Sequence, residues 1–255
     1  MTRNAIVSIL TSAIVVAAAP AAASAQQEYG RDVTVWTWEG RIDAGHWFSL
    51  NNVNGSVTID PSSDNSVHVR AEKIPHRNGD IRDVRFAVIQ SGGDIRICAL
   101  SRENDRCDED GLHSDGDRGR RGDRDRNVEV KFKVQVPRGV RVAAGTVNGS
   151  MSVRGTRAEV RASTVNGSID ATMSALNRDG DMKFSTVNGT ITVETPSSLD
   201  ANVSIDTMSG GISSDFPVQL SGRFGPRHAE GVIGRGGRRI SMNTVNGSVE
   251  LRKIR

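Results

Sequence analysis

Three closely related stretches decide the fold of this chain: VAAGTVNGSMSV (142–153), VRASTVNGSIDA (160–171) and MKFSTVNGTITV (182–193). Three more align with them without gaps, namely FSLNNVNGSVTI (48–59), VSIDTMSGGISS (203–214) and ISMNTVNGSVEL (240–251). From Gly149 onward, the aligned glycines are 18, 22, 21 and 37 residues apart. The last interval is close to two periods, so we expect one degenerate or inserted unit at about 215–235. A period of this length is typical of repeat architectures.

Apolar residues occupy fixed positions on both sides of the aligned glycine. The positions seven and five residues before it and two residues after it are apolar in all six stretches. This alternation predicts a strand on each side of the glycine, each with one buried face. The Asn-Gly pair between the strands is a turn signal, because glycine readily takes positive φ angles. The predicted turn residues are Asn54, Gly55, Asn148, Gly149, Asn166, Gly167, Asn188, Gly189, Gly210, Asn246 and Gly247.

Two all-β arrangements fit these strands and turns. In a β-solenoid, each unit of about 20 residues is one rung, and the turn is a corner where rungs stack in register. In the alternative, each Asn-Gly closes an antiparallel hairpin of a sandwich or meander. Near-identical residues at a near-fixed period favour the solenoid, with its most regular part at 138–251.

The repeated unit resembles the bacterial adhesin-type domains of the DUF4097 and DUF2807 families. The segment VEVKFKVQVPRGVRV (128–142) and the ending IGRGGRRISMNTVNGSVEL (233–251) share that resemblance, which covers about 45–70 and 128–251. It implies an all-β, right-handed β-helix-like solenoid on an exported protein. The family has no established catalytic residues, so the resemblance assigns none here.

The N-terminus has the pattern of a secretory signal peptide. Arg3 precedes an apolar run from Ala5 to Ala19, and Ala23-Ser24-Ala25 supplies a cleavage site after Ala25. The run is too short for a membrane-spanning helix, so we expect an extracytoplasmic chain, periplasmic or secreted, without a transmembrane segment after cleavage. Its net charge of +3 comes from 33 basic and 30 acidic residues that are interspersed, which argues against a nucleic-acid partner.

Cys98 and Cys107 are the only cysteines. In an oxidising compartment they predict one disulfide, with free thiols or a metal pair with Asp105 and Asp108 as alternatives. The segment 101–126 consists mostly of Arg, Asp, Glu and Gly, which predicts a disordered charged loop. Calcium binding by its aspartates and recognition through Arg121-Gly122-Asp123 are weaker interpretations.

All three tryptophans (Trp36, Trp38 and Trp47) precede the first repeat. We expect 26–47 to cap the open end of the solenoid, the alternative being an aromatic platform for a sugar or a partner. Residues 26–255 would then form a single all-β domain.

The pattern contains no assembled catalytic constellation. The outward columns are mostly small residues, with Arg161, Lys183 and Asp206 isolated among them, and no histidine falls in a repeat column. We therefore expect no enzyme, no cofactor and no metal, but a rigid surface for an unknown protein or glycan partner at the cell envelope.

Two other functions stay open. One is a carbohydrate-active lyase or hydrolase, for which Asp170, Asp206 and Glu250 are the carboxylates to test first. The other is a surface that binds an ordered lattice such as ice, for which the threonine column would have to face outward, whereas its phase with the apolar columns places it inward.

Overall fold

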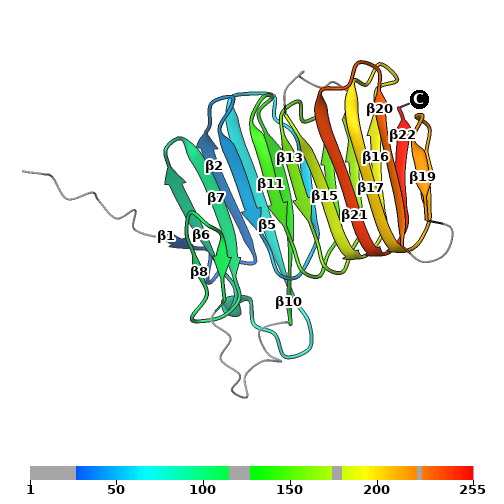
Figure 1. Cartoon of the computed structure of the whole chain (residues 1–255). Coiled ribbons are helices and arrows are strands. Elements are labelled where there is room, and N and C mark those ends of the chain that lie inside the picture. The colour runs from blue at the N-terminus through cyan, green and yellow to red at the C-terminus, as the bar shows by residue number, and fades with distance from the viewer. Residues whose placement is uncertain (1–26, 115–126, 174–179, 223–225, 255) are drawn as a thin grey trace, which may run out of the picture.

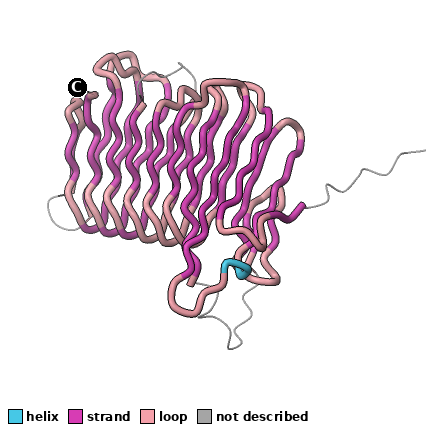
Figure 2. The backbone as a smooth tube through the Cα atoms, turned by 180° about the vertical axis from the view of Figure 1, so that it is seen from behind, coloured by secondary structure: helices cyan, strands magenta, loops and turns pink. Residues whose placement is uncertain are grey.

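In the computed structural model, the described residues are 27–114, 127–173, 180–222 and 226–254. They form two long β-sheets packed face to face, together with a two-stranded sheet and one short 3₁₀ helix, η1 (Ile81–Asp83). The strands of each sheet lie side by side along the length of the molecule (Figures 1 and 2). The expectation of a signal peptide over 1–25 lies outside the described residues.

Sheet A contains eleven strands in the described residues. In spatial order they are β1 (Gln27–Tyr29), β6 (Arg85–Ser91), β7 (Asp94–Leu100), β3 (Trp47–Asn51), β11 (Arg141–Gly145), β13 (Val160–Ser163), β15 (Met182–Asn188), β21 (Arg238–Asn246), β17 (Ala201–Ser209), β20 (Arg227–Ile233) and β19 (Gln219–Ser221).

Sheet B contains nine strands in the same part of the chain. Their order is β18 (Ile212–Ser214), β22 (Val249–Lys253), β16 (Ile191–Thr195), β14 (Ile169–Thr172), β12 (Met151–Arg154), β4 (Val57–Pro61), β10 (Val128–Val136), β5 (Ser66–Pro75) and β2 (Val35–Arg41). The third sheet pairs β8 (Arg106–Cys107) with β9 (Leu112–His113).

Each repeat contributes one strand to sheet A and the next strand to sheet B, with the conserved turn as the corner between them. Strands of neighbouring repeats pair in parallel, and Val142 stands opposite Val160, which in turn stands opposite Met182. The β-solenoid prediction is therefore confirmed. The hairpin alternative is wrong, because the two strands of a repeat lie in different sheets and do not pair with each other.

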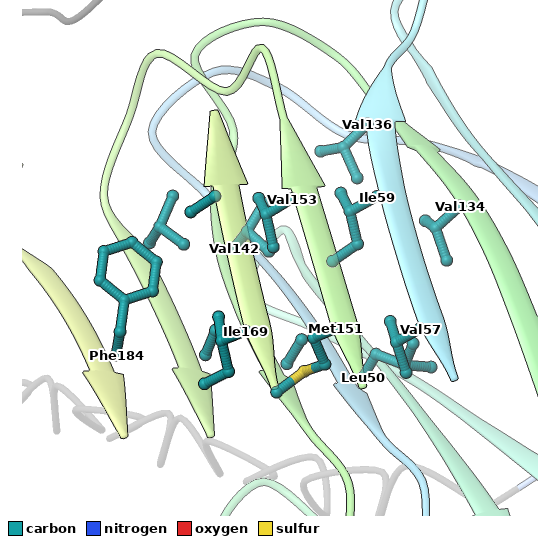
Figure 3. Packing of buried hydrophobic residues seen from close by; sticks show 14 of the residues in the cluster. Leu50, Val57, Ile59, Val134, Val136, Val142, Met151, Val153, Ile169 and Phe184 are labelled. Atoms are coloured by element: carbon teal, nitrogen blue, oxygen red, sulfur yellow. The ribbon is translucent and has the colours of Figure 1, made fainter. Parts of the chain in front are cut away.

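The apolar columns of the repeats fill the space between the sheets. Leu50, Val142 and Phe184 of sheet A and Met151 and Ile169 of sheet B point into this common core (Figure 3). All five are at most 1% exposed. Burial of this surface is the main stabilising contribution, because it removes apolar area from water along the whole stack.

The first and last repeats are not at the ends of the stack. β3 lies between β7 and β11, and β4 lies between β10 and β12. In the same way, β21 and β22 lie between the strands of 182–193 and those of 203–214. Both terminal repeats are thus inserted among units that are distant in sequence.

Of the two expectations for about 215–235, a degenerate rung is wrong, whereas an insertion is what the structure shows. In the described part of that stretch, β19 and β20 form an antiparallel pair, and β20 pairs antiparallel with β17 at the end of sheet A. A rung would need a second strand in sheet B, whereas this segment supplies both of its strands to sheet A.

The tryptophan-rich segment closes the other end of the stack. β2 is the outermost strand of sheet B and β1 the outermost strand of sheet A. Trp36 is buried and stacks on Phe86, with 4.6 Å between the ring centroids. Trp47, in contrast, is the residue directly before the first repeat and begins β3, so it does not lie in the end strands.

Residues 101–114 are folded, contrary to the expectation of a disordered loop; residues 115–126 lie outside the described part. A disulfide joins Cys98 and Cys107, and it connects this hairpin to β7. The buried Asp105 carboxylate accepts hydrogen bonds from the backbone amides of Ser101 and Arg102 and from the Ser114 hydroxyl. A charged segment can therefore fold here, because one of its carboxylates satisfies backbone donors that would otherwise be lost.

No helix in the described ranges has the length and apolar character needed to cross a membrane.

Candidate functional site: a groove on the outer face of sheet A

The predicted turn residues form continuous ladders along one edge of the stack. Each Asn side-chain amide donates to the Asn oxygen of the neighbouring rung at 2.8 Å. This ladder runs through Asn54, Asn148, Asn166, Asn188 and Asn246.

The threonine column lies inside the corners. Its five members are at most 5% exposed, and each hydroxyl donates to the carbonyl of a glycine on the neighbouring rung, as Thr164 does to Gly149 at 2.9 Å. Because these hydroxyls are buried, they cannot form the outward ladder that lattice binding requires.

A row of small side chains forms a depression on the outer face of sheet A. The register places Ser49 of β3 beside Ala143 of β11. Two residues further along β11, Gly145 lies beside Ser163 of β13. Phe48 and Leu50 alternate with Ser49 and point into the core. Strand pleating thus separates a packed inner face from an outer face with little side-chain volume.

Larger side chains rise on both sides of this floor. The row that contains Ser49 and Ala143 has Arg96 at one end and Arg161 followed by Lys183 at the other. Together they enclose two adjoining hollows of about 340 and 470 Å³, which share Ser49, Arg96, Ala143 and Arg161. We call these two hollows the sheet A groove.

Arg161 is held in place on the wall of the groove. Its guanidinium lies 4.6 Å from the centroid of the Trp47 ring and donates twice to Glu159 Oε1, at 2.7 and 3.0 Å. The Arg141 guanidinium lies 5.8 Å from the same ring. The contact with the Trp47 ring and the two hydrogen bonds to Glu159 restrict the conformations of the Arg161 side chain before a ligand binds.

The disulfide hairpin forms the opposite wall. Glu109 and Asp110 of the hairpin line the groove with Asp94, and the Glu109 carboxylate accepts a hydrogen bond from Ser91 at 2.8 Å. The Glu109 carbonyl accepts from Arg96 Nη2, also at 2.8 Å. Cys98 and Cys107 therefore act on the groove indirectly, by holding this hairpin against sheet A.

The three candidate catalytic carboxylates do not meet in one site, although Asp170 and Glu250 share a row of sheet B with Thr192 between them. Asp170 and Glu250 lie on sheet B, whereas Asp206 lies on β17 of sheet A, and none of the three lines the groove. Glu250 forms an ion pair with Arg252.

Asp206 has a different partner, His228 on the neighbouring strand. Its carboxylate lies 2.7 Å from His228 Nδ1, and this hydrogen bond raises the pKa of the histidine. The pair is exposed and away from the groove, so it forms no triad there. Across the described residues, no group of three or more His, Cys, Asp or Glu side chains could hold a metal ion.

Sequence reasoning found some of the groove residues but not their association. Arg161 and Lys183 were expected to be isolated, yet they stand opposite each other on β13 and β15. Their equal distance from the aligned glycine was the signal for this pairing. Arg96 had no such signal, because β7 lies outside the repeats.

A family model, Toastrack DUF4097, matches residues 140–252 of the chain. This part of the chain is similar to the Toastrack DUF4097 family. Among curated proteins, none matches the sequence.

Two solved structures are similar to this chain. One is described as a "putative cell adhesion protein" from Clostridium sporogenes ATCC 15579. It aligns with a TM-score of 0.53 and 9% identity over 86% of this chain and all of the other. The other is a "putative adhesin" from Bacteroides fragilis NCTC 9343, with a TM-score of 0.31 and 10% identity over 86% of this chain and 97% of the other. At 9% identity, the first likeness shows a shared fold and nothing finer.

Proposed function

We propose that this protein is a non-catalytic binding module of the adhesin type, and that it binds its partner in the sheet A groove. The observation that carries the proposal is the groove itself, in which a floor of small side chains lies between walls of charged ones. Concave sites with a few convergent polar groups are the usual form of ligand sites. The Clostridium sporogenes structure is described as a "putative cell adhesion protein", which agrees with a binding role.

Rigidity supports a binding role rather than catalysis. The groove floor consists of paired strands, so its polar groups keep fixed spacings and a ligand does not have to order them. Glycoside cleavage would need two carboxylates across one bond, and Asp206 is on a different sheet from Asp170 and Glu250. The other two are two strands apart on sheet B, about 10 Å between backbones, they lie outside the groove, and Glu250 forms an ion pair with Arg252.

The same proposal places the protein outside the cytoplasm, as one domain over 26–255. The Cys98–Cys107 disulfide supports this location, because such bonds persist in oxidising compartments. The N-terminal sequence supports it independently through its cleavage pattern. One apolar cluster that runs from Trp36 to Leu251 supports the single domain.

Filling the groove tests the proposed function. Ala143 lines both hollows, so Ala143→Trp should block them without changing the core. The matched control is Ser152→Trp on β12, the outward position of sheet B in the same rung. Purified protein is applied to a panel of neutral and acidic oligosaccharides, and both binding and product release are measured.

We expect binding that Ala143→Trp abolishes and Ser152→Trp leaves intact, with no product released. Two results would contradict the proposal. One is binding that is insensitive to Ala143→Trp; the other is reproducible cleavage that is lost on substitution of Asp170, Asp206 or Glu250.

A further inference from the structure

We infer that the sheet A groove takes an extended acidic glycan whose negative groups are carboxylates. This inference rests on the proposed binding function and names the class of its ligand.

The hollow over β3, β11 and β13 is lined by cations and small side chains. Arg96, Arg161 and Lys183 contribute to it, and no carboxylate does. Among the described residues, Lys183 forms no salt bridge, while Arg161 is bound to Glu159 and Arg96 to the Glu109 carbonyl. A chain with several negative groups that lies along this hollow would therefore pass three positive groups, in a recess where screening by water is weaker than on an open face.

The spacing of these cations selects a long ligand. Arg96 and Arg161 are three strands apart, which corresponds to about 14 Å between backbones, and Lys183 is one strand further, about 5 Å away. A single small acid can reach only one end of this row. A chain that runs across the strands can reach all three side chains, and the small residues beneath it leave room for its backbone.

The other end of the groove favours a glycan over a polyphosphate or a nucleic acid. There the lining includes the carboxylates of Asp94, Glu109 and Asp110. Carboxylates accept hydrogen bonds from hydroxyl donors. Every sugar of a uronic acid chain carries such hydroxyls beside its charge, whereas a polyphosphate chain carries none between its ends and a nucleic acid at most one per unit. A glycan has both hydroxyls and spaced acidic groups, and it can satisfy both ends at once.

Trp47 contributes as a positioning residue. It lines the larger hollow, and its ring lies against the Arg161 and Arg141 guanidinium groups. It therefore orients Arg161 toward a fixed geometry, so that less side-chain freedom is lost when an anion binds.

The test compares carboxylated oligosaccharides with their uncharged methyl esters. Calorimetry measures the Kd of the purified protein for oligogalacturonate, oligomannuronate and hyaluronan fragments. The neutral comparison is the fully methyl-esterified form of each chain, and inorganic polyphosphate is the polyanion comparison. Lys183→Gln tests the cationic row, and Lys133→Gln, an exposed lysine on the outer face of sheet B, is the matched control.

At least one carboxylated chain should bind, and its methyl ester about tenfold more weakly, because a charge-assisted contact of ordinary strength corresponds to that factor. Lys183→Gln should weaken binding by a similar factor, and Lys133→Gln should not change it. Thermal melting of each variant confirms that it is folded.

Three outcomes would overturn the inference. They are equal affinity for the acid and its ester, tighter binding of polyphosphate, and binding of none of the carboxylated chains. If a neutral glycan binds and Ala143→Trp abolishes it, the proposed function stands and only the acidic ligand class is wrong. If Ala143→Trp affects no binding at all, both fail.

Discussion

At the scale of single residues, the repeated glycine is required by a close approach between rungs more than by its dihedral angles. Gly149, Gly167 and Gly210 do not have positive φ angles, whereas Gly55 does, at 116°. A Cβ atom on Gly167 would lie 2.1 Å from the carbonyl oxygen of Gly149 on the next rung. The sequence-based explanation by turn conformation therefore accounts for only part of this column.

Two adjacent glycines allow this explanation to be tested. Gly210→Ala would place a methyl group 1.9 Å from the Gly247 carbonyl oxygen, whereas the nearest atom to the same methyl at Gly211 is Ser248 Oγ at 3.6 Å. We expect Gly210→Ala to reduce the free energy of unfolding by about 1–3 kcal/mol or more, since backbone must move. Gly211→Ala should change it by less than about 0.5 kcal/mol. Urea unfolding measures both, and equal midpoints would show that the close approach does not matter.

The threonine that precedes each turn solves a related problem. The glycine carbonyl it faces is buried at the corner, and its hydroxyl supplies a donor at 2.9–3.2 Å. A valine of the same shape would leave a polar group without its partner at that place. This explains why threonine recurs in a column whose phase is that of the core.

At the scale of elements, the repeats were predictable because each column has one physical environment. The apolar positions around Gly149 and Gly167 alternate with period two, and the structure buries the same residues on the same face. The corner position followed from the Asn-Gly pair. The segment 101–114 was not predictable from composition, because its folding depends on one disulfide and one buried carboxylate.

The spatial order of the rungs could not be read from the repeats either. All six units present nearly the same columns, so any unit can pair in register with any other. Nothing in the pattern distinguishes β21 beside β15 from β17 beside β15. For the same reason, the groove residue Arg96 was missed, since its strand joins the stack without carrying the repeat.

One buried lysine joins the elements at the N-terminal end. Lys73 on β5 is 1% exposed, and its Nζ donates to the carbonyl oxygens of Gly30, Arg31, Ile81 and Val84. These carbonyls come from the segment after β1, from η1 and from the residue between η1 and β6. Burial lowers the pKa of Lys73 to about 8 from 10.5.

This pKa predicts how the end of the stack responds to alkali. Between pH 8 and 10.5 the unfolded chain holds a proton on Lys73 that the folded chain has released, so the free energy of unfolding should rise with pH. The slope is about 1.4 kcal/mol per pH unit, and it should be absent below pH 8. The contribution of Lys73 to this slope is measured as the difference in unfolding free energy between the natural protein and Lys73→Met at each pH. A difference that is constant across this range, or that falls with pH, would refute the prediction, and Lys133→Met is the exposed control.

At the scale of the whole molecule, inserting the terminal repeats changes how the stack holds together. In a sequential solenoid each unit contacts only its neighbours in the chain, and stability is a sum of local terms. Here the repeat that ends the sequence supplies β21 and β22 to the interior of both sheets. The strands of 203–214, β17 and β18, are consequently joined to the rest of the stack by pairing with β21 and β22, which follow them in the sequence.

A cavity in the last repeat should therefore loosen segments far from it in sequence. Ile240 is fully buried and stands between Met182 of β15 and Val203 of β17. Ile240→Ala should cost about 2–5 kcal/mol and speed hydrogen exchange on β15 and β17 as well as on β21. Ile212→Ala, in β18 at the spatial end of sheet B, should affect exchange only near that end, because β18 pairs with β22 alone. Mass spectrometry of exchanged peptides distinguishes the two patterns. Faster exchange confined to β21 and β22 after Ile240→Ala would mean that the rungs are energetically independent despite their insertion.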